Sequence, residues 1–168
     1  MFVSSMNPCP CGFYGSPDKE CTCTPQAISK YMGKISGPLL DRIDIQIEVS
    51  PEKYEKLGND EMPESSDTIK KRVNDARKIQ IERYKQENIY SNSSLTPKLI
   101  SKYCKLDSEG KEILQTAFEK MGLSARAYGR ILKVARTIAD LDNCENIQKI
   151  HIAEAIQYRS LDKKYWKN

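Results

Sequence analysis

Apolar side chains recur at helical spacing through most of the second part of the chain. The runs predict five amphipathic helices over residues 65–168, because each carries an apolar residue every three or four positions. The expected helix caps include Ser65 or Ser66, Thr96 and Ser124. The apolar positions of the five helices are Ile69, Val73 and Ala76; Leu99, Ile100 and Tyr103; Ile113, Leu114, Ala117 and Met121; Ala127, Ile131, Val134, Ile138 and Leu141; and Ile152 and Ile156. Five such helices can close one small core, so a helical bundle is expected.

The first 50 residues follow a different pattern. Residues 2–6 form an apolar stretch that fits a buried strand, and residues 43–49 alternate apolar and polar side chains, which is typical of a strand with one buried face. Between them, Thr24 followed by Pro25 predicts the start of a helix. Two strands and one helix do not make a complete sheet, so this part is expected to be a piece of a larger α/β fold.

A stretch rich in Gly, Asn, Asp, Glu and Pro separates the two parts, from about residue 58 to residue 64. We therefore expect two domains. Residues 1–60 are expected to be the end of an α/β core, and residues 65–168 are expected to be an almost wholly helical domain. The predicted fold class is an α+β fragment that is mainly α.

Composition and charge narrow the function classes. The chain has 168 residues, of which 39% are hydrophobic and 30% are charged, as expected for a globular protein. It has no run of about 18 apolar residues and does not open with a secretory signal, so a cytoplasmic protein without a membrane span is expected. Residues 65–168 carry 21 basic and 13 acidic side chains, against 6 and 10 in residues 1–64. A basic part of this kind serves nucleic acid, nucleotide phosphates or solubility.

Four of the six cysteines lie close together near the start, in the motifs Cys9-Pro-Cys11 and Cys21-Thr-Cys23. In a reducing compartment, paired thiols at short spacing more often bind metal or do redox work than form structural disulfides. Four thiolates can surround one Zn²⁺ tetrahedrally and leave no open position for water, so a structural zinc site is expected. A redox or disulfide pair, and ordinary cysteines without a ligand, are the alternatives.

The other two cysteines and the only histidine suggest no site of their own. Cys104 and Cys144 lie far apart in the helical part, where each is expected to be a small buried hydrophobic residue. His151 precedes the last helix and has no cysteine or carboxylate cluster beside it in the sequence. A capping or surface role is therefore expected for this histidine.

Four motifs occur in order along the chain: SSMNPCPCG, CTCTP, ISGPLLDRIDI and LSARAYGRILKVARTIADL. Together they resemble the C-terminal part of the ComM/YifB family, magnesium-chelatase-like members of the AAA+ ATPases. Each motif is weak by itself, but four in order over about 140 residues make a specific signature. The resemblance implies that the first part is the C-terminal end of an AAA+ α/β core with a four-cysteine loop, and that the second part is the AAA+ helical lid.

The resemblance also implies roles for four polar residues. Asn7 corresponds to the sensor 1 residue, which orients the water that attacks the γ-phosphate. Arg42 in LLDRID corresponds to the arginine finger, which reaches into the nucleotide site of a neighbouring subunit. Arg126 corresponds to the nucleotide-binding sensor 2 arginine near the start of a lid helix, and Arg130, one turn further along, is the second candidate for that role.

Each of these residues also has an ordinary structural interpretation. Asn7 can cap a turn before Pro8, and the two lid arginines can lie on a helix surface. Arg42 can form a surface ion pair with Asp41 or Asp44, which is the more common outcome for an arginine beside two carboxylates. For Arg42 the resemblance favours the finger over the ion pair.

The resemblance implies a parent protein that is a ring-forming ATPase. It is expected to be a hexamer that binds ATP and Mg²⁺ and acts on DNA, with branch migration during recombination or natural transformation as its work. The chain has neither a G-x-x-x-x-G-K-[ST] loop (Walker A) nor an apolar strand ending in paired acidic residues (Walker B), so it is not expected to hydrolyse ATP alone. Two other functions are considered: the ATPase subunit of a porphyrin magnesium chelatase, and a non-enzymatic, zinc-stabilised interaction module.

Overall fold

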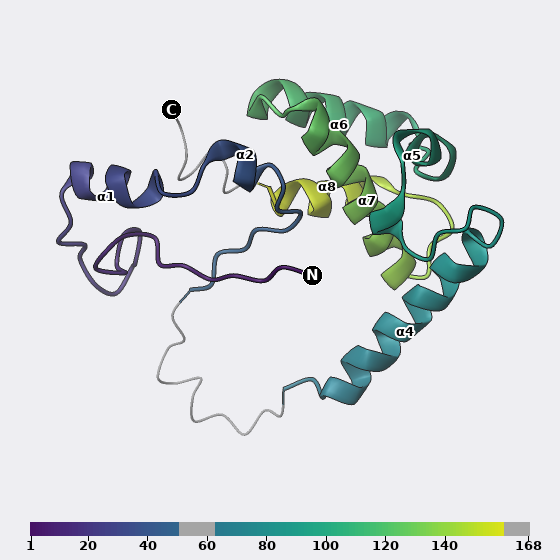
Figure 1. Cartoon of the computed structure of the whole chain (residues 1–168), viewed down its shortest axis with the longest axis horizontal. Coiled ribbons are helices and arrows are strands. Elements are labelled where there is room, and N and C mark those ends of the chain that lie inside the picture. Colours follow the sequence, from purple (N-terminus) through teal and green to yellow (C-terminus); the bar gives the residue numbers. More distant parts are fainter. Residues whose placement is uncertain (51–62, 160–168) are drawn as a thin grey trace.

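A computed structural model describes residues 1–50 and 63–159, which form seven α-helices and one 3₁₀ helix (Figure 1). Their bounds are Pro25–Met32 (α1), Gly37–Leu40 (α2), Ser66–Arg83 (α4), Asn92–Ser94 (the 3₁₀ helix η1), Pro97–Tyr103 (α5), Ser108–Met121 (α6), Ala125–Leu141 (α7) and Lys149–Gln157 (α8). The five helices predicted for the second part are therefore confirmed as α4 to α8. The predicted linker lies outside the described residues up to position 62.

Side-chain caps define the starts of four helices, as the sequence predicts. Thr24, Ser65, Thr96 and Ser124 each accept a hydrogen bond from the backbone amide three residues further on. These bonds satisfy backbone donors that have no partner within the helix. At the other end of α6, Gly122 takes a left-handed conformation with φ of 58°, which glycine adopts without the strain of a side chain.

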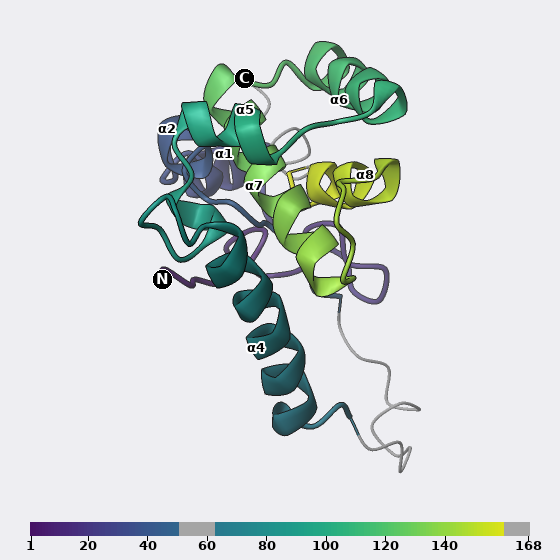
Figure 2. The ribbon, with the colours of Figure 1, turned by 90° about the vertical axis from the view of Figure 1, so that its right-hand side faces the viewer.

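Helix α7 forms the centre of the bundle. Helices α4, α5 and α8 and the 3₁₀ helix η1 pack against it, and α6 packs against α8 (Figures 1 and 2). The buried apolar side chains of this core come from these helices and the turns between them. They are Tyr84, Leu95, Cys104, Leu114, Ile131, Leu132, Ala135, Ile138, Ala139, Ile147, Ile152 and Ala155. The bundle therefore has one continuous core, to which α7 contributes more residues than any other element.

The N-terminal part of α4 extends beyond the other helices (Figure 2). Ile69 and Val73 on this part are 41% and 46% exposed, whereas Ala76 further along is 4% exposed. The apolar face predicted for this helix is therefore buried only where α4 meets the bundle. Within the described ranges, no helix is long and apolar enough to cross a membrane.

The predictions for the isolated cysteines and the histidine are largely confirmed. Cys104 is buried in the core, and Cys144 is half-buried near the end of α7. His151 caps α8, because its Nδ1 accepts a hydrogen bond of 2.9 Å from the backbone amide of Gln148. The ring of His151 is only 1% exposed, so this cap is buried.

A charged cluster joins α4, η1 and α7. Asp140 on α7 is 2% exposed, and its carboxylate accepts hydrogen bonds from Arg83 on α4 at 3.0 Å and from Asn92 in η1 at 2.8 Å. Arg136, one turn earlier on α7, donates a further bond of 3.1 Å to the same carboxylate. Tyr84 donates to the side-chain oxygen of Asn92 at 2.6 Å. A buried carboxylate is tolerated only when it is paired and hydrogen-bonded, so the cluster fixes how α4 and η1 sit on α7.

Arg136 extends this cluster to the loop between α7 and α8. Its side chain is 2% exposed, and its two terminal nitrogens donate to the carbonyl oxygens of Cys144 and Glu145 at 2.6 and 2.8 Å. These carbonyls lie in a segment without helix or strand, where backbone groups need other partners. One arginine therefore satisfies both a buried carboxylate and an irregular loop.

The two predicted strands are wrong. Among residues 1–50 and 63–159 there is no strand, and the only bridge is an isolated parallel one between Leu106 and Ile147. Phe2 is 73% exposed and Ile47 is 65% exposed, so neither segment buries its apolar face. A strand needs a neighbouring strand to bond to, and none is present in the part that the structure describes. The β part of the predicted α+β class is therefore corrected, and the mainly helical part is confirmed.

Replacing Asp140 with alanine tests the charged cluster. The Asp140→Ala variant leaves the buried guanidinium of Arg136 without its carboxylate, so we expect the free energy of unfolding to fall by about 3–5 kcal/mol. Urea unfolding followed by circular dichroism measures this change. The matched control is Asp75→Ala, which removes an exposed pair with Lys78 and is expected to change stability by at most about 0.5 kcal/mol. Equal losses in the two variants would contradict a structural role for the cluster.

Candidate functional site

The four clustered cysteines come together in a loop that precedes α1. Their sulfur atoms all lie within 4.8 Å of one another, with Cys9 and Cys11 3.3 Å apart and Cys11 and Cys21 3.5 Å apart. The loop turns after Cys9, where the backbone amide of Gly12 donates to the Cys9 carbonyl at 3.0 Å. Gly12 has φ of 85°, a conformation that side-chain-bearing residues rarely adopt. The second cysteine pair leads directly to the N-cap of α1.

Backbone amides point at the sulfur atoms of this cysteine loop. The amide of Tyr14 donates to Cys9 Sγ at 3.4 Å. The amide of Phe13 is the main cause that lowers the pKa of Cys11 to about 6. The amide of Cys23 lowers the pKa of Cys21, but burial and the neighbouring thiols outweigh it and raise that pKa to about 12. Such amide donors favour thiolates, the form of cysteine that binds metal.

The donor set fits a tetrahedral Zn²⁺ site. Zinc–sulfur bonds of about 2.3 Å place the four sulfurs of such a site about 3.8 Å apart. The sulfur atoms of Cys9 and Cys21 lie 3.7 Å apart, close to this value. All six cysteines are free thiols, so no disulfide competes for these four. The cluster can therefore bind a metal ion such as zinc, and four protein ligands leave no open position for catalysis.

The Arg42 segment (residues 41–46) lies on the helical bundle. Arg130 on α7 donates to the carbonyl oxygen of Arg42 at 2.8 Å and forms an ion pair with Asp44. After α8, Arg159 is 1% exposed and donates to the carbonyl oxygen of Ile43 at 2.9 Å. Main-chain groups that have no helix or strand partner are thus bonded to arginines from the bundle.

The side chain of Arg42 is exposed, while the two carboxylates beside it are engaged elsewhere. Asp44 pairs with Arg130, and Asp41 lies 3.5 Å from Arg159. Within the described residues, neither carboxylate pairs with Arg42, and the Arg42 guanidinium has no hydrogen bond. The surface ion pair considered for Arg42 is therefore not the arrangement found. An unpaired guanidinium on a fixed segment can reach an anion on another molecule.

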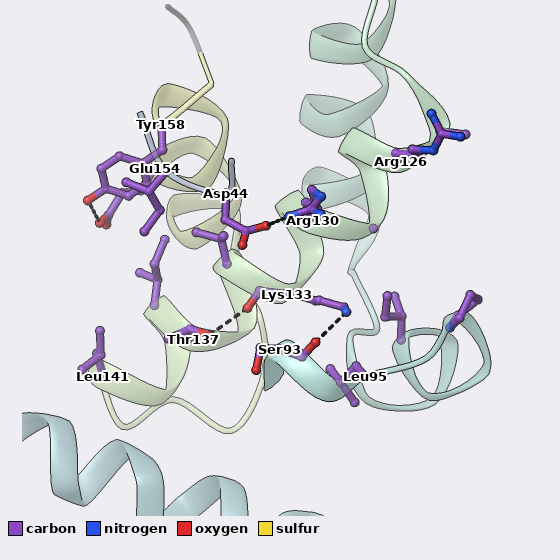
Figure 3. Close-up of a pocket in the computed structure, with 17 residues that line it drawn as sticks. Asp44, Ser93, Leu95, Arg126, Arg130, Lys133, Thr137, Leu141, Glu154 and Tyr158 are labelled. Atoms are coloured by element: carbon purple, nitrogen blue, oxygen red, sulfur yellow. Dashed lines mark hydrogen bonds and ion pairs between the residues drawn. The ribbon is translucent and has the colours of Figure 1, made fainter. Parts of the chain in front are cut away.

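An open cavity of about 730 Å³ lies along α7 (Figure 3). Its walls come from α5, η1, the end of α8 and the Arg42 segment, and they are mostly apolar. Arg126, Arg130 and Lys133 stand along one side of α7, and Figure 3 shows Arg130 directed at Asp44 and Lys133 at the carbonyl of Ser93. In the part of the chain that the structure describes, Arg126 is the one of these three cations without a polar partner.

Arg126 lies in the first turn of α7, where the helix dipole adds positive potential. It is exposed, so its guanidinium is available to an anion. Arg130, the second candidate for nucleotide contact, is instead engaged with the Arg42 segment. Of these two arginines of α7, Arg126 therefore has the geometry that suits phosphate binding.

Asn7 lies at the start of the cysteine loop. Its side chain is exposed and packs beside Gly12, where an added Cβ would lie 3.6 Å from Asn7 Nδ2. Neither end of the Asn7 amide makes a hydrogen bond to any residue in the described ranges, so the turn-capping interpretation has no bond to support it. The structure brings Arg42 and Arg130 together, and it places Asn7 beside Gly12 of the cysteine loop. This loop, which precedes α1, lies at the end of the molecule away from α4 (Figure 1).

Sequence reasoning missed Arg159 and the engagement of Arg130. Arginine is rarely buried unless it is paired, and no residue near Arg159 in the sequence indicates its distant partners. The contacts span 116 residues from Arg159 to Ile43 and 88 residues from Arg130 to Arg42. No spacing rule within a helix or loop covers such distances, and the only available signal was the pair of carboxylates that flank Arg42.

Comparisons with known proteins agree with the resemblance of the motifs. The family model described as magnesium chelatase, subunit ChlI, matches residues 1–57, and the model of the ChlI C-terminal region matches residues 63–159. The uncharacterised protein YifB of Escherichia coli is 40% identical over 162 residues, which cover 96% of this chain and 31% of YifB. The competence protein ComM of Haemophilus influenzae is 42% identical over 160 residues, which cover 95% of this chain and 30% of ComM.

A more distant relative is an uncharacterised protein of Mycobacterium tuberculosis, 29% identical over 157 residues, which cover 94% of this chain and 31% of the relative. The chain thus spans about a third of the length of the curated relatives it matches. In each relative the similarity extends over nearly all of the present chain. The chain belongs to the magnesium chelatase ChlI family, in the C-terminal region of that family, and is homologous to YifB and ComM.

Proposed function

We propose that this chain is the C-terminal region of an AAA+ ATPase that works as a ring of subunits, and that Arg42 is its arginine finger. The observation that carries the proposal is an exposed guanidinium on a segment whose neighbouring carboxylates and carbonyls are held by other arginines. A finger must act on a neighbouring subunit's nucleotide, so it must be exposed and yet well positioned. A ring, taken to be a hexamer, supplies the neighbour.

The remaining proposed roles rest on the resemblance of the motifs. Arg126 contacts the nucleotide as sensor 2 from the first turn of α7, and Asn7 acts as sensor 1 beside the cysteine loop. ATP and Mg²⁺ are bound by the rest of the protein, since the phosphate loop and the paired acidic residues are not part of this sequence. Residues 1–60 are proposed to belong to the ATPase core and residues 65–168 to the lid, and the separate family matches over residues 1–57 and 63–159 support this division.

We propose DNA as the substrate on which the motor works, with branch migration during recombination or natural transformation as the process. Homology to a competence protein supports this assignment, as does the excess of basic side chains in residues 65–168. The zinc ion is proposed to be structural, because four cysteines complete its coordination.

The name of the matching family favours one other function, the ATPase subunit of a porphyrin magnesium chelatase. ATP hydrolysis would then drive insertion of Mg²⁺ into the porphyrin through a partner complex. The four-cysteine loop has no role in that reaction, which speaks against it. A third possibility is a zinc-stabilised interaction module without activity, in which Arg42 has only a structural role. Dependence of ATP turnover on DNA and on Arg42 separates the three.

Removing the Arg42 guanidinium tests the finger. In the full-length protein, Arg42→Ala is expected to lower ATP turnover by about a thousandfold while ATP binding is retained, because the finger stabilises charge in the transition state only. Arg42→Lys is expected to recover little of this loss, since an ammonium lacks the planar fork of the guanidinium. Turnover with and without branched DNA, together with ATP affinity, provides the measurement.

The matched control for this experiment is Arg77→Ala, which removes an exposed arginine from α4. It is expected to leave ATP turnover unchanged. Full turnover in the Arg42→Ala protein would reject the finger and favour the interaction module. Turnover that requires Arg42 but is indifferent to DNA would favour the chelatase.

Removing one cysteine tests the metal site. In Cys21→Ser, zinc content is expected to fall from about one ion per chain to near zero, because three thiolates no longer complete the tetrahedral site. Elemental analysis of purified protein provides the measurement, and Cys144→Ser, outside the cluster, is the control that keeps its zinc. Equal zinc in the two variants, or none in the unaltered protein, would reject the site.

A further inference from the structure

The Arg42 segment (residues 41–46) is irregular but firmly held. Its backbone forms neither a strand nor a long helix, so its orientation depends on contacts with the bundle. The amide of Gln46 donates to the carbonyl oxygen of Tyr158 at 2.9 Å, just beyond the end of α8. At the other end of the segment, Ser124, which caps α7, donates to Asp41 at 3.3 Å. The segment is thus tied to the bundle at both ends.

Arg130 ties the middle of the segment. One nitrogen, Nη1, donates both to the carbonyl oxygen of Arg42 and to the carboxylate of Asp44. The first bond holds the backbone of Arg42, the arginine proposed to be the finger. The second bond holds the side chain of Asp44, two residues further along the chain. Arg130 therefore fixes the peptide that carries the Arg42 side chain while leaving that side chain exposed.

The pair between Arg130 and Asp44 is partly exposed to solvent, so it can position the Arg42 segment without contributing much to the stability of the fold. The side chain of Arg130 is 31% exposed and that of Asp44 is 56% exposed, so solvent screens this pair and its contribution to overall stability is small. Arg159, by contrast, is almost fully buried and also bonds Asp41 and Ile43, so its removal would disturb folding. Arg130 is thus the residue whose loss would move Arg42 without unfolding the chain.

We infer that Arg130 is a positioning residue for Arg42, an assignment that rests on the proposed finger. It touches no nucleotide and acts only by orienting the Arg42 backbone. Because Arg130 lies on α7, the orientation of Arg42 is tied to the position of that helix. Small displacements of a catalytic group are costly, and one of about 1 Å lowers a rate about a hundredfold.

A double-mutant cycle in the full-length protein tests this inference. Arg130→Ala is expected to lower the maximal rate of ATP turnover by about a hundredfold with ATP affinity unchanged. In the Arg42→Ala background, the same change is expected to cause no further loss, because a misplaced finger matters only when the finger is present. Arg130→Lys keeps a donor at the same place and is expected to restore most of the rate. The matched control is Lys133→Ala. Lys133 lies on the same helix but donates to the carbonyl oxygen of Ser93 and not to the Arg42 segment, so its removal is expected to leave the rate unchanged.

The outcomes distinguish this inference from the proposed function. A further loss in the double variant, or full turnover in Arg130→Ala when Arg42→Ala is inactive, overturns the positioning role and leaves the finger intact. If Arg42→Ala itself keeps full turnover, the proposed finger is rejected. Amide hydrogen exchange of residues 41–46 then tests whether Arg130 anchors the Arg42 segment to α7. Faster exchange in Arg130→Ala than in Lys133→Ala then supports anchoring by Arg130, and equal exchange rejects it.

Discussion

The buried carboxylate of Asp140 imposes the constraint on which the bundle depends. An ionised group with 2% exposure is tolerated only when donors surround it, and these come from three elements: Arg83 on α4, Asn92 in η1 and Arg136 on α7. Apolar packing alone allows helices to slide or rotate, whereas each of these bonds has a fixed geometry. The cluster thus selects one arrangement of α4 and η1 on α7, and α7 becomes the fixed element to which other segments attach.

Arginines from this fixed element and from the end of α8 then hold the irregular segments. Arg136 donates to two carbonyls of the α7–α8 loop, Arg130 to the carbonyl of Arg42, and Arg159 to the carbonyl of Ile43. A guanidinium suits this work because it carries several donors in a rigid plane and stays charged when buried. The same chemistry therefore stabilises a loop in one place and, in the proposed function, orients a catalytic arginine in another.

The helix starts were predictable from sequence because a cap is a local interaction: Thr24, Ser65, Thr96 and Ser124 each bond an amide three residues away. The cysteine cluster was predictable for a similar reason, since its members lie within one short loop with glycines that permit the turn. The strands could not be predicted in the same way. Alternation of apolar and polar side chains shows only which face of a strand would be buried, and it does not show whether a partner strand is present. The engagement of Arg130 joins residues far apart in the chain, and no local pattern reports it.

The central claim is that bundle arginines are rigidly hydrogen-bonded while the proposed nucleotide-contacting arginines stay exposed. Nitrogen-15 NMR of arginine side chains tests it most directly, because hydrogen-bonded guanidinium groups rotate slowly and exchange their protons slowly. We predict resolved, slowly exchanging Nη signals for Arg83, Arg136 and Arg159, and averaged signals for Arg42 and Arg126. Averaged, rapidly exchanging signals for all five would contradict it.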